Sequence, residues 1–142
     1  CDHHCSGCQN PQTWDATAGN QFAEKTMLEL LDLIRPDYIR GLTFSGGDPL
    51  FVQNRLIVQY ICERVRKEFG DTKDIWMWTG YTWNQIKGLP LLHYIDVLVD
   101  GPYIEAERDI SLPWAGSRNQ RVINVKQSLK KNEIVLWKES QL

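Results

Sequence analysis

The chain has 142 residues, 42% hydrophobic and 24% charged, so it is long and apolar enough to bury one core. Its formal net charge of -2 argues against nucleic-acid binding, because no basic excess is available to neutralise phosphates. No apolar run is long enough to cross a bilayer, and no signal-peptide pattern opens the chain. We therefore expect a cytoplasmic protein that does not associate with membranes.

Apolar periodicity along the chain predicts strands that alternate with helices. Residues 1–19 contain glycine, proline and asparagine breakers and predict a loop. The elements expected after this loop are a helix over residues 20–34, a strand over 39–44, a helix over 52–69, a strand over 74–79, a short helix over 83–87, and strands over 95–99, 121–125 and 134–137.

Two helical stripes carry most of this prediction. Asn20 is a candidate N-cap for the first helix, Pro36 follows its end, and Gly70 follows the second helix. The apolar positions assigned to the buried stripes are Met27, Leu28, Leu31 and Ile34 in the first helix, and Leu56, Ile57, Tyr60, Ile61 and Val65 in the second.

This order of elements predicts an α/β fold, a single domain over residues 1–142 with a mainly parallel sheet. Loops that follow parallel strands lie at one edge of the sheet, where ligands bind. Residues 45–49, 79–81 and 100–103 each follow a predicted strand. We expect these three loops to face one shared site.

Three of the four cysteines, Cys1, Cys5 and Cys8, form a C-x3-C-x2-C pattern within eight residues. Crowded thiols in a polar loop predict a metal site, because unbound thiols there would be reactive. Zinc is one alternative, with His3 or His4 as the fourth ligand. A buried apolar stripe of cysteines is another, although the surrounding residues form helices poorly.

An iron–sulfur cluster is the interpretation that the pattern favours. A cubane cluster usually takes four cysteines, so three would leave one iron open to a substrate. The fourth cysteine, Cys62, lies at a helical position beside apolar residues, and we expect it in the core. We also expect Trp76 and Trp78 in the core, and Trp14 as a candidate shield for the cluster loop.

Beyond the cysteines, further motifs give the sequence a family resemblance. It is similar to the radical S-adenosylmethionine (SAM) superfamily and, within it, to the activating enzymes of anaerobic ribonucleoside-triphosphate reductases. Gly7 stands where many radical SAM members carry an aromatic residue, and Asp48 where many carry Glu. The motifs that carry the resemblance are residues 5–10 (CSGCQN), 13–14 (TW), 45–50 (SGGDPL), 76–81 (WMWTGY), 96–101 (DVLVDG) and 116–121 (GSRNQR).

The resemblance implies a partial, open radical SAM β/α barrel whose first strand is missing from this chain. It also implies that Cys1, Cys5 and Cys8 bind three irons of a [4Fe–4S] cluster, while SAM chelates the fourth. One electron from the reduced cluster would split SAM into methionine and a 5′-deoxyadenosyl radical. That radical would take a hydrogen atom from a glycine of the reductase. An electron donor such as a flavodoxin would reduce the cluster.

Strand-end residues are the expected SAM contacts. Two glycines allow close backbone approach, and a carboxylate accepts hydrogen bonds from an ammonium group. Ordinary turn chemistry is the alternative for each of these positions, and for residues 116–120. No residue is expected to act as a catalytic acid or base. The expected cofactor-binding residues are Ser45, Gly46, Gly47, Asp48, Thr79 and Asp100.

Two other functions remain open from the sequence. One is another radical SAM activity, such as activation of pyruvate formate-lyase, for which a longer chain is expected. The other is a zinc-stabilised interaction module without enzymatic activity. Iron content and a glycyl radical on the reductase distinguish these possibilities.

Overall fold

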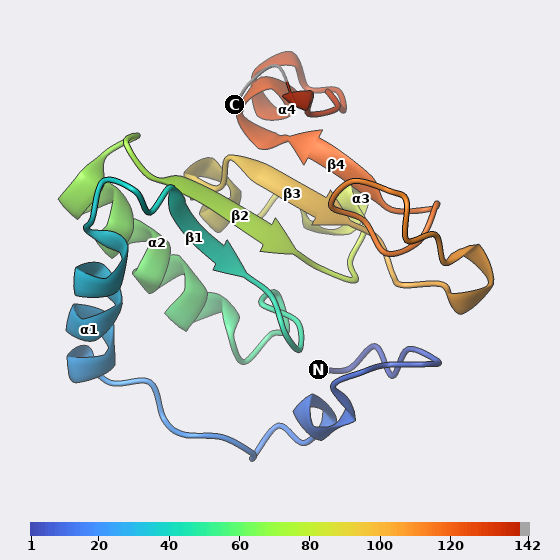
Figure 1. The fold of residues 1–142 in the computed structure, drawn as a ribbon, viewed down its shortest axis with the longest axis horizontal. Helices are drawn as coiled ribbons and strands as arrows, with labels where there is room; N and C mark the ends of the chain where they lie inside the picture. Colours follow the sequence, from blue (N-terminus) through green and yellow to red (C-terminus); the bar gives the residue numbers. More distant parts are fainter. Residues whose placement is uncertain (140–142) are drawn as a thin grey trace.

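The computed structural model describes residues 1–139 and has the predicted α/β organisation (Figure 1). Short 3-10 helices at Pro11–Trp14, Pro90–Tyr94 and Glu105–Glu107 complete the regular structure. The helices are α1 (Glu24–Ile34), α2 (Arg55–Phe69), α3 (Trp83–Ile86) and α4 (Val125–Lys131), and the strands are β1 (Gly41–Phe44), β2 (Asp74–Trp78), β3 (Val97–Asp100) and β4 (Arg121–Asn124).

A four-stranded open sheet in the order β1-β2-β3-β4 forms the centre of the molecule. β1, β2 and β3 are parallel, whereas β4 pairs antiparallel with β3. Every residue of β3 is buried, as its continuous apolar sequence predicts for a strand covered on both faces. The mainly parallel sheet is therefore confirmed, with an antiparallel strand at one edge.

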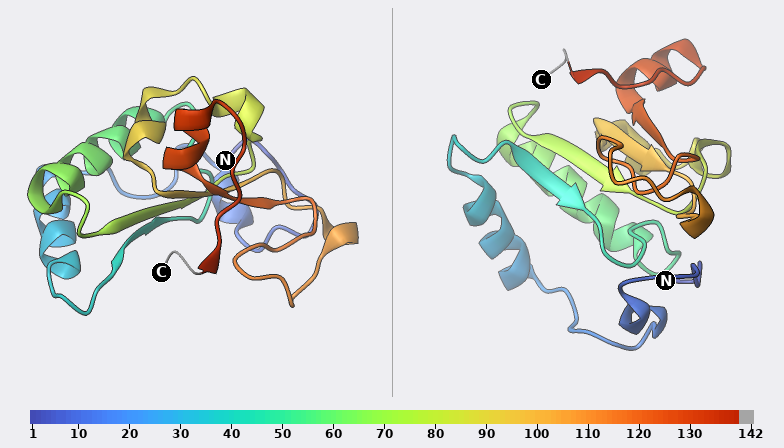
Figure 2. Two further views of the ribbon diagram at one scale, coloured as in Figure 1. Left: turned by 90° about the horizontal axis from the view of Figure 1, so that it is seen from above. Right: turned by 45° about the vertical axis from the view of Figure 1, so that its right-hand side comes forward.

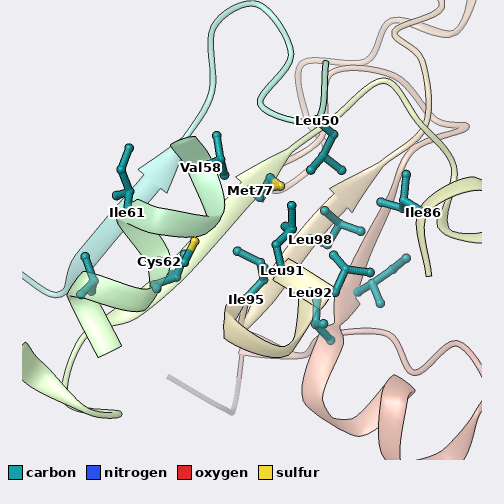
Figure 3. Packing of buried hydrophobic residues seen from close by; sticks show 14 of the residues in the cluster. Leu50, Val58, Ile61, Cys62, Met77, Ile86, Leu91, Leu92, Ile95 and Leu98 are labelled. Atoms are coloured by element: carbon teal, nitrogen blue, oxygen red, sulfur yellow. The ribbon is translucent and has the colours of Figure 1, made fainter. Parts of the chain in front are cut away.

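One face of the sheet packs against the helices and forms the hydrophobic core (Figures 2 and 3). Side chains alternate along β2, so Ile75 and Met77 point to this face and are fully buried. Cys62 lies beside them on α2, as predicted. Each such aliphatic side chain contributes about 1.5–3 kcal/mol through burial, which holds the helices on the sheet.

The other face of β2 carries a cluster of tryptophans. Trp76 and Trp78 are half-buried there, so their predicted place in the core is wrong. Trp76 contacts Trp114 and Trp137 at centroid separations of 5.1 and 5.0 Å, and Trp78 donates a hydrogen bond to the Trp114 carbonyl at 2.7 Å. Alternation along the strand places these rings opposite Met77 and away from the helices.

Both long helices begin later than predicted, and their buried stripes differ. α1 has Ala23 at its N-cap, so the prediction of Asn20 as the cap is wrong. Leu28, Leu56 and Ile57 are exposed. The helix faces that pack on the core instead carry neighbouring residues, such as Met27 in α1 and Val58 in α2. Gly70 caps α2 with a positive φ of 58°, as predicted.

The C-terminal part differs most from the prediction. α4 was not predicted, because its seven residues include only two apolar side chains. The strand predicted over residues 134–137 is wrong, since Leu136 makes only an isolated bridge with Ile123. Residues 140–142, part of the expected single domain, lie outside the described residues. Within residues 1–139, no helix is long and apolar enough to span a membrane.

Candidate functional site

The carboxyl ends of β1, β2 and β3 open onto a cavity of about 560 Å³. The loop of residues 1–10 lies against the same edge, as Figure 1 shows near the N label. The cysteine loop and the strand-end loops therefore face one site, as expected. The lining residues comprise Cys1, His3, Cys5, Gly7, Cys8, Gln9, Thr13, Trp14, Ser45, Gly46, Gly47, Asp48, Trp78, Thr79, Gly80, Gly101, Tyr103, Arg108, Asp109, Ile110, Ala115, Gly116 and Gln120.

Local backbone geometry turns the cysteine side chains toward this cavity. His4 and Gly7 have positive φ values of 48° and 76°, and the Cys8 amide donates to the Cys5 carbonyl at 3.1 Å. All three thiols are free and half-buried. The Asn10 amide donates to Cys8 Sγ at 3.4 Å, the kind of contact that tunes the potential of a bound cluster.

Ligand atoms close enough for a single metal ion occur in one set at this loop. Tetrahedral zinc with bonds of about 2.3 Å would bring its sulfurs to roughly 3.8 Å from one another. The sulfurs of Cys1, Cys5 and Cys8 do not make a set within 4.8 Å; within the described chain, only Cys1, Asp2 and His3 offer three such ligand atoms. Of the three loop cysteines, only Cys1 belongs to a set of this size in the described chain.

The turn after β1 approaches the cysteine loop closely. Gly46 has a φ of 103°, which favours glycine, and a side chain there would meet nothing within 4 Å. A Cβ at Gly47 would lie 3.1 Å from the Thr13 Cβ and 3.5 Å from the Cys1 Cβ. The two glycines therefore have different roles: Gly46 allows the turn, and Gly47 allows the cysteine loop to pack on it.

Asp48 is the most buried acidic group of the cavity wall, with only 2% of the residue exposed. Its carboxylate accepts hydrogen bonds from the Leu50 amide at 2.8 Å, the Gly80 amide at 2.8 Å and the Thr79 hydroxyl at 2.9 and 3.0 Å. His3 Nε2 lies 2.5 Å from Asp48 Oδ2. In the described part of the chain, no lysine or arginine forms an ion pair with Asp48.

Thr79 and Asp100, the other expected contacts, occupy different environments. Thr79 lines the cavity, and its hydroxyl is directed to Asp48. Asp100 is buried beside the cavity and not on its wall; it accepts two hydrogen bonds from Arg121 and one from the Trp83 amide. The Asp100 carboxylate raises the pKa of the Arg121 guanidinium, mainly through these hydrogen bonds.

Another part of the cavity wall comes from the loop after β3, whose first residues, 100–103, were expected at the site. Tyr103 lines the cavity, as expected, and so do Arg108, Asp109 and Ile110, which no motif marks. The Glu105 carboxylate accepts a hydrogen bond from the Tyr103 hydroxyl and lies against Gly7, where a Cβ would come 2.9 Å from Oε2. This loop therefore contacts the cysteine loop across the cavity.

Residues 116–120 form a turn at the end of that wall. Gly116 and Gln120 line the cavity, and Gln120 Oε1 accepts a hydrogen bond from the Gly116 amide at 2.9 Å. Gln120 Nε2 donates to the Gly101 carbonyl at 3.0 Å. Arg118 is exposed. Part of this motif thus faces the site and part faces solvent.

Comparison with known proteins defines the class. Residues 1–123 match the family model described as a 4Fe-4S single cluster domain. The chain is therefore an iron–sulfur protein with an α/β fold and a thiol-lined cavity at one edge of its sheet. No solved structure matches the chain.

Several relatives share one name. The chain is 44% identical over 122 residues to the anaerobic ribonucleoside-triphosphate reductase-activating protein of Enterobacteria phage T4, covering 86% of this chain and 77% of the relative. The Vibrio cholerae protein of that name is 41% identical over 124 residues (84% and 79% covered). The Escherichia coli K12 protein is 36% identical over 126 residues (86% and 81%). The chain belongs to the family of anaerobic ribonucleoside-triphosphate reductase-activating proteins.

Proposed function

We propose that this chain is a radical SAM enzyme that activates an anaerobic ribonucleoside-triphosphate reductase by creating a glycyl radical. One observation carries the proposal: the three free thiols and the Asp48-bearing turn face the same cavity. A cluster held by three thiols keeps one iron without a protein ligand. If the amino-acid end of SAM binds beside Asp48, its amino and carboxylate groups would have access to that iron. We also propose that the open four-stranded sheet is a partial radical SAM β/α barrel.

Cys1, Cys5 and Cys8 would hold the [4Fe–4S] cluster. When bound, the reduced cluster would supply the electron that cleaves SAM into methionine and a 5′-deoxyadenosyl radical. That radical would take a hydrogen atom from the reductase glycine. Ser45, Gly46, Gly47 and Asp48 would hold the amino-acid end of SAM.

Charge supports a cationic ligand beside Asp48. The carboxylate is buried among neutral donors and His3, and no lysine or arginine in the described chain pairs with it. A negative charge next to a cavity attracts positive groups, and SAM carries both a sulfonium and an ammonium. Thr79 and Asp100 lie at the neighbouring strand ends, where we propose that the adenosine binds. Asp100 would contribute indirectly, by holding the end of β3 in place through its hydrogen bonds to Trp83 and Arg121.

Anaerobic reconstitution with iron and sulfide tests the proposal. The expected result is about four irons per chain and formation of methionine and 5′-deoxyadenosine when SAM and a reductant such as reduced flavodoxin are added. Mixing with the reductase should then give a glycyl radical in electron paramagnetic resonance spectra. A protein that binds one zinc and no iron, or that loads iron but leaves SAM intact, would contradict the proposal.

A further inference from the structure

His3 connects the cysteine loop to the buried carboxylate of the cavity wall. It lies between Cys1 and Cys5, and its side chain is only 18% exposed. Its Nε2 contacts Asp48 Oδ2. The neighbouring His4 is exposed and contacts only local groups, the Asp2 carbonyl at 3.2 Å and the Trp14 ring at 4.8 Å. The two adjacent histidines therefore have separate environments.

Asp48 is a fixed point for this contact. Its other donors are the Leu50 and Gly80 amides and the buried Thr79 hydroxyl, which belong to the ends of β1 and β2. His3 Nε2 meets the same carboxylate from the cysteine loop. These donors come from three separate segments of the chain: the turn after β1, the end of β2 and the cysteine loop. Asp48 consequently holds both strand ends and the cysteine loop.

Ring packing fixes the orientation of His3 as well. The imidazole lies directly on Gly80, where a Cβ would come 2.7 Å from two ring atoms. The edge of the ring meets Tyr81, with the centroids 4.6 Å apart and the planes at 67°. Tyr81 in turn directs its hydroxyl to Asp2, at 3.2 Å from one carboxylate oxygen. The bare backbone of Gly80 therefore provides the space that the imidazole occupies.

We propose that His3 is a positioning residue that fixes Cys1 and Cys5 relative to the wall of residues 45–48. The inference rests on the proposed function, because it concerns the spacing between the cluster and the SAM site. Without His3 the three thiols still bind iron, since none of them is lost. The cluster then takes a range of positions relative to Ser45–Asp48, and SAM binds more weakly.

The test compares His3→Ala, His3→Gln and the matched control His4→Asn in reconstituted protein. Asn is chosen for residue 4 because it tolerates the positive φ there. Iron per chain, the SAM dissociation constant from equilibrium dialysis, and the paramagnetic resonance spectrum of the reduced cluster with and without SAM are measured. We expect His3→Ala to keep its iron but to bind SAM about tenfold more weakly, with a smaller SAM-induced spectral change.

His3→Gln should recover most of the affinity, because its amide also donates to a carboxylate, and His4→Asn should match the unchanged protein. Gly80→Ala should reproduce the His3→Ala defect, since its methyl group takes the place of the ring. Unchanged SAM affinity and spectra in His3→Ala, or a Gln variant no better than Ala, would overturn the inference. Absence of any SAM effect on the unchanged protein would instead refute the proposed function.

Discussion

Two aspartates at opposite edges of the sheet show how differently the chain treats a carboxylate. Asp96 precedes β3 and accepts hydrogen bonds from Arg66 at 2.6 Å and the Ile75 amide at 2.7 Å, while Lys126 lies 2.9 Å away. Asp48 follows β1 and meets neutral donors and His3. Arg66 and Lys126 pair with Asp96 within the protein, so its contribution is to the stability of the fold. Asp48 lines the cavity and has no lysine or arginine partner among the described residues.

The thiols show the same division. Burial raises the pKa of Cys62 to about 12, so this thiol on α2 stays protonated at neutral pH in the hydrophobic core. The other three cysteines are half-buried on the cavity wall. Ligand chemistry is thus concentrated at the carboxyl edge of the strands, and the helix-covered side and the amino edge stabilise the fold.

Removal of one proposed ligand thiol should have the largest effect. Cys5→Ser should lower the iron content after reconstitution from about four per chain to below about one, because a neutral hydroxyl is a poor iron ligand. Cys62→Ala is the matched control and should retain full iron. Iron analysis and the visible spectrum measure both. Equal iron loss in the two variants would erase the distinction between the two kinds of cysteine.

Asp48→Asn should be next in size. It removes the charge with little change in volume and places an amide among donors, so SAM should bind about 100-fold more weakly while the three thiols still load iron. Equilibrium dialysis on the folded, reconstituted variant measures this. The comparison between the two carboxylates fails if Asp48→Asn binds SAM like the unchanged protein.

Asp96→Asn should give the reverse result. Loss of this carboxylate leaves Arg66 without its closest acidic partner and should lower the free energy of unfolding by about 2–3 kcal/mol. SAM affinity should not change, since Asp96 lies at the other edge. Urea unfolding together with dialysis checks both parts. A fall in SAM affinity at full stability would contradict the assignment.

The smallest effect concerns pH. A hydrogen bond from Lys126 lowers the pKa of Asp71 below its ordinary value of 3.8. A carboxylate with a lowered pKa stabilises the fold above its unfolded pKa, and this contribution is lost as the pH falls through the folded value. Asp71→Asn should therefore show a smaller drop in urea midpoint between about pH 6 and about pH 3.

Asp37→Asn is the control for this measurement, because Asp37 is exposed and forms no ion pair in the described part of the chain. Its pH dependence should follow that of the unchanged protein. An identical acid drop in Asp71→Asn and the unchanged protein would show that the Lys126 contact adds nothing at this amino edge.

The alternation of strands and helices, the shared edge and the core position of Cys62 could be predicted from the sequence, because they depend on periodicity and on the geometry of parallel strands. The pairing of Asp100 with Arg121 could not, since it requires the antiparallel register of β4. The place of His3 was also missed, because it depends on contacts 45 residues apart in the sequence. Trp76 was misassigned because strand alternation does not reveal which face the helices cover.

The distribution of the six tryptophans has a practical consequence. Trp14 and Trp78 line the cavity, whereas Trp83 is buried elsewhere. An absorbing group that enters the cavity would take excitation energy from the two nearby indoles. The protein thus contains its own optical probe, and its ultraviolet emission should fall as the site is loaded, so that assembly can be followed in real time without a label.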